Sequence, residues 1–532
     1  MPNYGYEAGR DHEYESRLDR AIDDFANSYE NDLSPDRTTV FLFPGGMGSQ
    51  LMRARSPYTR PPFTYYKSWL ARNILGGEAK NLQIEPNGVD YEQQYVVPDG
   101  GIDFDCPFVH LHPYADFITW CKNNSIHLFV FGWDWRRGVQ HSTDFFLDNF
   151  LPKFKARFDS VTPHPLDNFT LIGHSAGGMV VKVIANQAAN PYVQRMKRAI
   201  TVASPFYGYG AQIHLYIMGH HDLNATIGGP EAARTMAGIV STMPGGYEFV
   251  YLDKLTYDAN ANAFANDPEG YNLLSYPSMD KANPSEAADP YNPTDASGKV
   301  RYPLGYGFRK DLLIEGIAGS RKVSSRLDPG IAAKFYSIRG VQAKNGNILQ
   351  ETVVSQRWKR VVPNFNPDAP VLDPIADIPG PGDGVQPAWG ARLLGLPPAQ
   401  VITVVDNIEH VTMMNAPSVQ NEIATLLGLD LTTVTFMKPT EVPVASRKDV
   451  NDFLTGLRRE VTDKQLAPED LHKALAGYLG KFKREQLGAL FARAYIDLLK
   501  SPSQVVSPST VPKQKKATKK PAPRSERGRK GE

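Results

Sequence analysis

Six short and almost continuously apolar segments recur along the first 430 residues, separated by polar loops rich in Gly and Pro. Continuous rather than alternating apolar residues are typical of strands that are buried on both faces, as in a parallel sheet. Segments with helical spacing lie between several of them, so the pattern predicts an α/β fold on a mostly parallel sheet. The predicted strands are 40–43, 125–135, 169–175, 198–205, 334–340 and 401–407.

Three connecting segments show the apolar spacing of helices. The first is 113–123 and the third is 179–189. The second follows Ser142, which is a residue type suited to an N-cap. It presents the apolar residues Phe145, Phe146, Phe150 and Leu151.

Two long stretches interrupt the alternation of strands and helices. Residues 206–333 are rich in Pro, Asn, Asp and Tyr, which indicates an inserted cap or lid, and 341–382 form a second irregular excursion. Beyond Pro443, apolar residues repeat at helical spacing behind Ser446 and Asp449, which form a partial capping box. We therefore predict a polar leader at 1–37, an α/β core at 38–205 and 334–430, a cap at 206–333, a linker at 431–445, a helical unit at 446–500 and a disordered basic tail at 501–532.

Charge and composition limit the classes of function. The chain has 532 residues and a net charge of +1, but residues 501–532 alone contain nine Lys or Arg and two Asp or Glu. A basic tail on a mildly acidic body favours a solvated appendage that can touch a membrane surface transiently, and no nucleic-acid partner is expected. The sequence shows no secretory signal and no apolar run of the ~18 residues that a membrane span needs, so a cytoplasmic location is expected. Of the two cysteines, Cys121 has the helical spacing of a buried free thiol.

The segment Gly173-His174-Ser175-Ala176-Gly177 fits the pattern G-x-S-x-G. It follows an apolar strand and precedes a helix, which is the setting of a nucleophile elbow. The glycines allow the sharp turn and the close approach of helix to strand, and the helix N-terminus directs N–H groups toward a developing oxyanion. Ser175 is therefore the candidate nucleophile; the alternative is a small residue in a tight turn.

A serine nucleophile needs a base and an acid, which in this fold follow it in the order acid, then His. His410 follows the last predicted strand and precedes a helix, a position shared by no other later histidine except His472 of the appended helical unit. The acid stays open among Asp373, Asp377 and Asp383, of which Asp383 alone lies in a tight Gly-Asp-Gly turn.

A second oxyanion donor is expected from the loop after the first strand, PGGMGSQ. Gly45, Gly46 and Gly48 allow its backbone to approach a substrate, so these glycines are candidate substrate-binding residues. A phosphate-binding loop is the alternative, but no Lys follows at P-loop spacing.

Seven short blocks, in this order, resemble the lecithin–cholesterol acyltransferase family of α/β-hydrolases, with its phospholipase and phospholipid–diacylglycerol acyltransferase relatives. The resemblance spans roughly 38–428. The blocks are FLFPGGMGSQL, FGWDWRR, LIGHSAGG, ASPFYGYG, KFYSIRG, GDGVQPAWG and EHVTMMN.

This resemblance implies a catalytic triad of Ser175, Asp383 and His410, and an oxyanion hole formed by the backbone N–H groups of Met47 and Ala176. It also implies that Asp134-Trp135-Arg136 supports the site and that STMPGGYEFVYLDKL covers the acyl pocket. The chain departs from the family in three respects: Val385 stands where Thr is usual, the usual secretion signal and disulfides are absent, and the C-terminal helices and tail lie outside the pattern.

The expected activity is that of a serine lipase, phospholipase or O-acyltransferase that acts on a lipid ester through an acyl-enzyme, with water or an alcohol as acceptor. No cofactor and no metal are expected, because neither His110-x-His112 nor His220-His221-Asp222 has a third ligand at zinc-like spacing. The alternatives are a non-catalytic lipid-binding or scaffold protein on a hydrolase fold, and a phospholipase effector delivered without a signal peptide.

Overall fold

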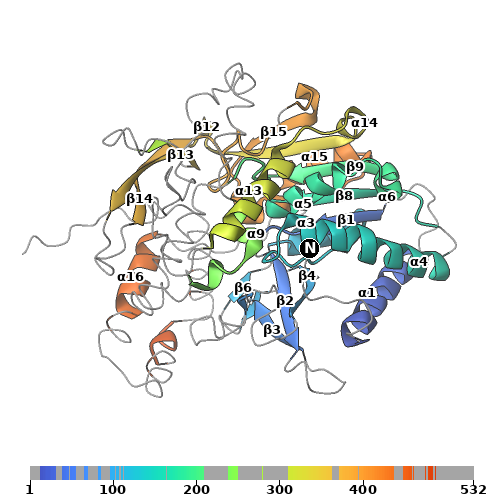
Figure 1. Cartoon of the computed structure of the whole chain (residues 1–532), viewed down its shortest axis with the longest axis horizontal. Coiled ribbons are helices and arrows are strands. Elements are labelled where there is room, and N and C mark those ends of the chain that lie inside the picture. The colour runs from blue at the N-terminus through green and yellow to red at the C-terminus, as the bar shows by residue number, and fades with distance from the viewer. Residues whose placement is uncertain are drawn as a thin grey trace, which may run out of the picture.

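The structure is a computed structural model, and its central element is a parallel β-sheet between two layers of helices (Figure 1). It describes residues 12–30, 39–46, 48–54, 65–69, 82–84, 96–101, 104–106, 109–111, 113–162, 165–208, 238–249, 278–279, 309–350, 352–361, 371–393, 395–436, 447–457, 459, 474, 477–482, 486 and 490.

The sheet contains all six strands that the apolar pattern predicts, and all six run parallel. A two-residue strand, β12 (Asn347–Ile348), adds to the end of β11 in the antiparallel direction. In spatial order, the six parallel strands are β7 (His127–Val130), β1 (Thr39–Phe43), β8 (Phe169–His174), β9 (Met196–Val202), β11 (Phe335–Lys344) and β15 (Val401–Asp406). The predicted α/β fold with a mostly parallel sheet is confirmed.

The order of the strands determines where a ligand can bind. The chain passes from β1 to β7 on one side and then returns to β8 on the other side of β1. In open α/β sheets, ligands bind at the carboxyl ends of the strands where the order reverses in this way. That position lies here between β1 and β8, and the loops that follow these two strands contain Gly45 and Ser175.

Alternate residues of β1 enter two separate apolar cores, one on each face of the sheet. Phe41 and Phe43 belong to the larger core, whereas Val40 and Leu42 belong to the smaller one. The larger core lies under α1 (His12–Glu30), α3 (Val139–Asp144), α4 (Leu151–Val161), α5 (Ala176–Ala185) and α13 (Lys310–Ser324). The smaller core lies under α2 (Ala115–Asn123) and α15 (Pro417–Leu427).

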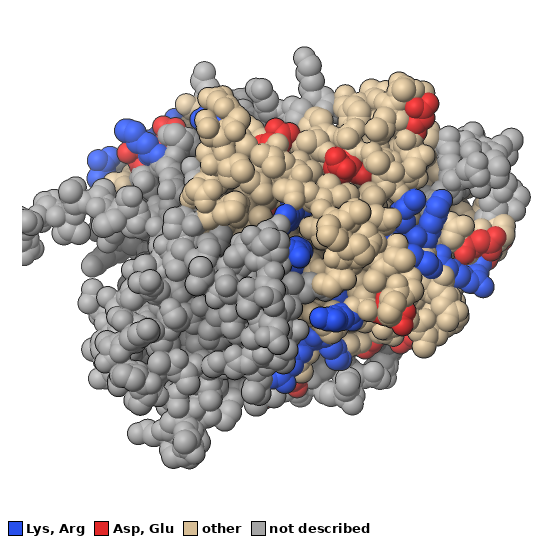
Figure 2. Space-filling view, turned by 90° about the horizontal axis from the view of Figure 1, so that it is seen from above, with Lys and Arg blue, Asp and Glu red and all other residues tan. Residues whose placement is uncertain are grey.

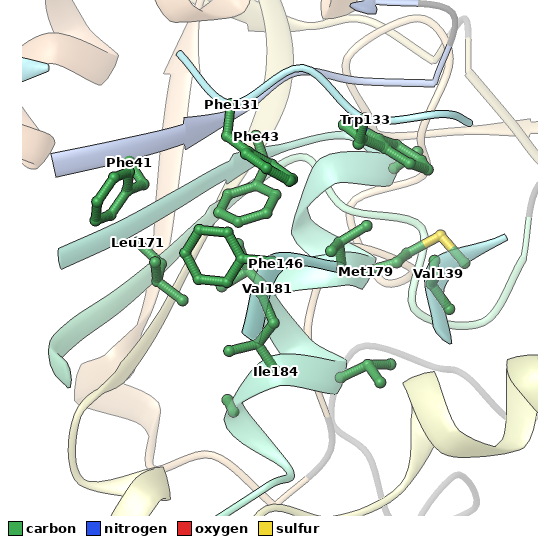
Figure 3. Close-up of a cluster of buried hydrophobic side chains, with 14 of the residues drawn as sticks. Phe41, Phe43, Phe131, Trp133, Val139, Phe146, Leu171, Met179, Val181 and Ile184 are labelled. Atoms are coloured by element: carbon green, nitrogen blue, oxygen red, sulfur yellow. The ribbon is translucent and has the colours of Figure 1, made fainter. Parts of the chain in front are cut away.

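Aromatic rings dominate the larger core (Figure 3). The Phe41 ring makes edge-on contacts with Phe146 and Phe154, at centroid separations of 5.6 and 4.9 Å. Such contacts add about 0.5–1.5 kcal/mol each beyond the burial of apolar area. The single long helical run from α3 through a π-helical turn, η3 (Phe145–Phe150), to α4 is therefore fixed against β1.

The predicted N-cap at Ser142 is wrong. The helix begins three residues earlier at Val139, and the Ser142 hydroxyl lies inside it and donates to the carbonyl of Gly138 at 3.1 Å. A distant residue takes the capping role, because the Glu248 carboxyl accepts the Val139 N–H at 2.6 Å. The cap is thus supplied by tertiary structure, which a local sequence pattern does not reveal.

We expect Glu248 to make the stability of the protein depend on pH. Burial raises the pKa of Glu248 to about 8, although the Val139 N–H and Lys322 act in the opposite direction. Because this pKa lies above that of an unfolded chain, the stabilisation by the neutral carboxyl is complete below about pH 4.5 and is lost as the pH rises through about 8. Between about pH 4.5 and pH 8, the free energy of unfolding of the wild type should therefore fall by on the order of a few kcal/mol relative to that of Glu248→Gln.

Urea unfolding at pH 5, 7 and 9 would measure this difference. Glu315→Gln, an exposed substitution on α13, serves as the matched control. Parallel pH profiles for the wild type and Glu248→Gln would contradict the assignment.

Within the predicted cap, two described helices pack against each other: α9 (Pro244–Tyr247) and α13. The latter also packs on α5, and Leu312 and Val323 join the larger core. The excursion at 341–382, expected to be irregular, contains two paired antiparallel strands, β13 (Thr352–Val361) and β14 (Val371–Gly380). The other short strands are β2 (Ser49–Ala54), β3 (Tyr65–Trp69), β4 (Val96–Gly101), β5 (Phe104–Cys106), β6 (Val109–Leu111) and β10 (Ser278–Met279).

The terminal regions are described in part. The predicted leader contains α1, whose Asp23 pairs with Arg157 of α4. The predicted helical unit contains α16 (Arg447–Leu457), where Phe453 packs on Tyr478 and Phe482. The tail 501–532 and Ser446 lie outside the described residues. The remaining described helices are α6 (Pro191–Gln194), α14 (Pro329–Ala332), and the 3-10 turns η4 (Pro398–Gln400) and η5 (His410–Asn415).

The face of the molecule in Figure 2 carries both basic and acidic side chains, interspersed among uncharged ones. Among the described residues, no helix is long and apolar enough to cross a bilayer. Cys121 is buried and reduced, and burial raises the pKa of its thiol.

Candidate active site

Ser175 stands at a sharp turn between strand β8 and helix α5. Its backbone has φ 51° and ψ −125°, a conformation that costs a non-glycine residue free energy and is common at functional sites. The Ser175 N–H donates to the carbonyl of Val202 on β9 at 2.8 Å, which fixes the turn to the sheet. The Ser175 side chain is only half-buried, so its hydroxyl remains accessible at the end of the strand.

Glycines make this turn possible because the helix passes directly over the first strand. A Cβ on Gly177 would lie 2.1 Å from the carbonyl oxygen of Phe43, and one on Gly173 would lie 2.5 Å from Cα of Gly178. Both distances are far below van der Waals contact. The role that the sequence pattern gave to these glycines therefore has a direct steric cause.

The structure brings Ser175, His410 and Asp383 together in a hydrogen-bonded row. His410 Nε2 lies 2.9 Å from Ser175 Oγ, and His410 Nδ1 lies 2.7 Å from Asp383 Oδ2. Asp383 and His410 are both buried, at 1% and 5% exposure. The arrangement has the geometry in which a base activates a serine and a carboxylate orients the base.

The tight turn predicted around Asp383 is present. Gly384 has φ +92°, and a Cβ on Gly382 would lie 2.5 Å from the carbonyl oxygen of Gln386. The second carboxylate oxygen, Oδ1, accepts the N–H groups of Val385 and Gln386 at 3.1 and 2.7 Å. Because the donor at position 385 is a backbone N–H, the departure from Thr to Val leaves this bond intact.

The two other candidate acids lie earlier, in strand β14. Asp377 pairs with Gln356 and Asp373 pairs with Lys359 across the β13–β14 ladder. Of the three aspartates, Asp383 is the one with a hydrogen bond to His410 among the described contacts.

The glycine loop after β1 lies directly against the candidate nucleophile. A Cβ on Gly45 would lie 3.1 Å from Ser175 Cβ, and one on Gly46 would lie 3.2 Å from Ala176 Cβ and 3.4 Å from the Phe249 ring. Gly48 donates its N–H to the Gly45 carbonyl at 2.8 Å, which ties the two ends of the loop together. Ala176 is the first residue of α5, whereas Met47 lies outside the described residues.

Two buried side chains that no sequence motif indicated, Tyr114 and His174, join this loop to His410. The Gly45 N–H donates to the Tyr114 hydroxyl at 2.7 Å, and the Tyr114 hydroxyl lies 2.9 Å from His174 Nδ1. His174 Nε2 lies 2.9 Å from the carbonyl oxygen of His410. His174 occupies the variable position of the G-x-S-x-G pattern, and Tyr114 lies 60 residues away in the sequence, so local spacing gave no signal.

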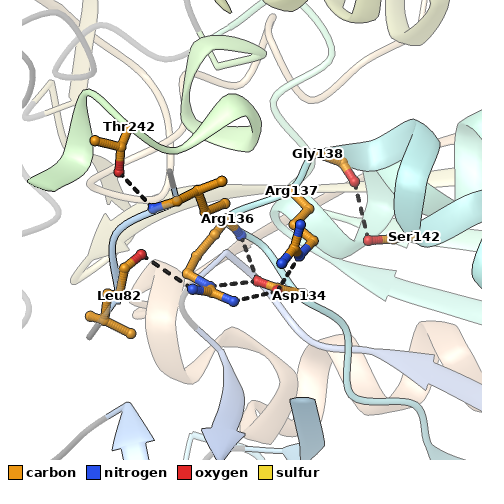
Figure 4. A network of polar contacts seen from close by, with 8 residues as sticks. Leu82, Asp134, Arg136, Arg137, Gly138, Ser142 and Thr242 are labelled. Carbon is orange, nitrogen blue, oxygen red and sulfur yellow. Dashed lines mark hydrogen bonds and ion pairs between the residues drawn. The ribbon is translucent and has the colours of Figure 1, made fainter. Parts of the chain in front are cut away.

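Around the segment Asp134-Trp135-Arg136, a buried ion-pair network joins Asp134 with Arg136 and Arg137 (Figure 4). Arg136 donates to both oxygens of Asp134, at 2.9 and 2.6 Å, and Arg137 donates to one of them at 3.2 Å. Burial raises the pKa of Asp134, but the two arginine charges outweigh it, so the pKa lies below its usual value. Arg136 also accepts the N–H of Gly245 with its carbonyl at 2.7 Å, which anchors the segment 238–249.

Metal-ligating clusters of three or more His, Cys, Asp or Glu do not occur among the described residues. The backbone of His110 is part of β6, while His112 and His220-His221-Asp222 lie outside the described part of the chain.

No family model matches this sequence, and no curated protein matches it. One solved structure that is similar is the Tle4–Tli4 complex: the match is 13% identical, covers 74% of this chain and 98% of that chain, and has a TM-score of 0.44. Another is EstA from Clostridium botulinum, at 11% identity, 77% and 97% coverage and a TM-score of 0.28. At these identities the likeness concerns the fold alone, and membership of the lecithin–cholesterol acyltransferase family stays a prediction.

Proposed function

We propose that this protein is a serine-dependent acyl hydrolase or O-acyltransferase that acts on a lipid ester. The observation that carries the proposal is the row Ser175–His410–Asp383, with separations of 2.9 and 2.7 Å, on a strained turn at the carboxyl end of a parallel strand. A non-catalytic protein on the same fold needs neither a strained turn at the serine nor a hydrogen-bonded Ser–His–Asp triad.

In the proposed reaction, Ser175 Oγ attacks the acyl carbonyl while His410 Nε2 takes its proton. Asp383 holds the Nδ1–H and stabilises the imidazolium that forms. The backbone N–H groups of Ala176 and Met47 stabilise the oxyanion, as the sequence resemblance implies. His410 then returns the proton to the leaving alcohol, and water or a second alcohol releases the acyl group from the serine.

Two observations support a lipid as the substrate. The ordered blocks of the sequence resemble a family of lipid acyl hydrolases and transferases. In addition, the apolar ring of Phe249, which belongs to the segment expected to cover the acyl pocket, lies against Gly46 of the glycine loop. An apolar side chain beside the nucleophile suits an acyl chain better than a polar substrate.

Fatty-acid release tests this proposal. The purified protein should release fatty acid from mixed micelles of a phospholipid or a diacylglycerol, and Ser175→Ala should not. Addition of a long-chain alcohol or a sterol should divert the acyl group to a new ester if the protein is a transferase. No release above the level of Ser175→Ala from any of these esters would contradict a lipid substrate.

A further inference from the structure

We infer that Tyr114 and His174 are positioning residues that couple the glycine loop to His410. This inference rests on the proposed function and goes beyond it, because neither residue belongs to the triad or the oxyanion hole. The basis is a continuous row of buried hydrogen bonds from the Gly45 N–H through Tyr114 and His174 to the His410 carbonyl, at 2.7, 2.9 and 2.9 Å.

The direction of each hydrogen bond in the row is fixed by chemistry. The His410 carbonyl can only accept, so His174 Nε2 must carry a proton. Burial, reinforced by the proximity of His410, lowers the pKa of His174 to about 3, so the ring is neutral and Nδ1 is an acceptor. The Tyr114 hydroxyl therefore donates to His174 Nδ1 and uses its oxygen to accept the Gly45 N–H.

A neutral His174 also suits the charge that the proposed reaction creates. Its ring centroid lies 5.1 Å from that of His410. A cation at this distance would oppose the formation of the imidazolium on His410. Because His174 stays neutral over the working pH range, it orients the backbone of His410 without this repulsion.

The start of helix α2 anchors the row. Tyr114 is the N-cap residue of α2 and is 3% exposed, and the Phe117 N–H of the first turn donates to Asn415 Oδ1 at 3.0 Å. Asn415 ends η5, the 3-10 turn that begins with His410. One helix end therefore holds both the glycine loop, at Gly45, and the histidine turn, which fixes the loop relative to the base.

Steady-state kinetics of Tyr114→Phe on p-nitrophenyl butyrate would test the inference, together with the inhibition constant of a boronic acid that forms a tetrahedral adduct with the serine. The substitution removes one hydroxyl and keeps the ring. We expect kcat to fall about 10- to 100-fold, less than the 100- to 1,000-fold loss for removal of an oxyanion donor. KM should change little, and the boronic acid inhibition constant should rise by the same factor as kcat falls, because both report on transition-state geometry.

Tyr478→Phe is the matched control, since it also removes a buried tyrosine hydroxyl, here one that donates to the Phe453 carbonyl at 2.7 Å. It should leave kcat and the inhibition constant unchanged. If Tyr114→Phe does not fold, His174→Gln gives the same test. Its amide nitrogen can replace Nε2 as the donor to the His410 carbonyl, and its amide oxygen then lies away from the position of Nδ1, where Tyr114 donates.

Wild-type kcat and inhibition constant in the folded Tyr114→Phe variant would overturn the inference and leave the proposed function intact. A change in KM alone would overturn it as well. A wild-type protein without esterase activity would instead overturn the proposed function.

Discussion

Ser175→Ala is expected to reduce kcat on a soluble ester by about 10⁶-fold, the loss typical when the nucleophile of a serine triad is removed. The reason is that no other hydroxyl among the described residues stands 2.9 Å from a histidine that is itself paired with a carboxylate. Ala can occupy the same backbone conformation at a cost similar to that of Ser, so the fold should persist. The measurement is kcat by burst-corrected steady-state kinetics, with circular dichroism to confirm folding.

Contamination by another esterase is the main risk in this measurement, and a second variant controls for it. Ser204→Ala also removes a buried serine hydroxyl near the same turn, where Ser204 packs against Gly178. It should retain turnover within about an order of magnitude, because no described hydrogen bond joins its hydroxyl to Ser175, His410 or Asp383. A kcat for Ser175→Ala equal to that of the wild type would refute Ser175 as the nucleophile.

Asp383→Asn is expected to lower kcat by about 10⁴-fold, as the equivalent change does in a serine protease triad. The amide keeps the shape of the side chain and can still accept the N–H groups of Val385 and Gln386. It can also donate toward His410 Nδ1, which leaves the proton on Nε2, where the ring can no longer accept the proton of Ser175. The loss should therefore appear in kcat rather than in folding.

Asp377→Asn is the comparison variant, because Asp377 was an alternative acid in the sequence and lies in β14 opposite Gln356. The substitution should raise the activation free energy for kcat by on the order of 1 kcal/mol or less, as for the loss of a single hydrogen bond. An inactive Asp377→Asn together with an active Asp383→Asn would show that the acid is assigned wrongly.

Continuous apolar runs were sufficient to predict the six strands and their parallel arrangement, because a strand buried on both faces leaves few positions for polar residues. They were not sufficient for features that depend on distant contacts. The cap of α3 comes from Glu248, 109 residues away from Val139, so the local signal at Ser142 was misleading. Strand β14 contains Pro374 and Pro379, and β13 contains many polar residues, and this composition concealed their pairing.

The candidate site was predictable where chemistry and local turn geometry coincide. Asp383 lies between two glycines, Ser175 lies two residues from a glycine on either side, and His410 follows the last strand. Tyr114 and His174 could not be found in this way, because a tyrosine before a helix and a histidine after a strand have no distinctive spacing. Their relation depends on the adjacency of β1 and β8 and on the position of α2, which the fold determines.

Labelling by a fluorophosphonate, followed by peptide mass spectrometry, tests whether Ser175 is an activated nucleophile. Only a hydroxyl activated by a neighbouring base reacts rapidly with such a reagent. One adduct per folded chain is expected, located on Ser175 and absent after replacement of His410 by Ala. An adduct on a different residue, or an unlabelled Ser175 in folded protein, would contradict it.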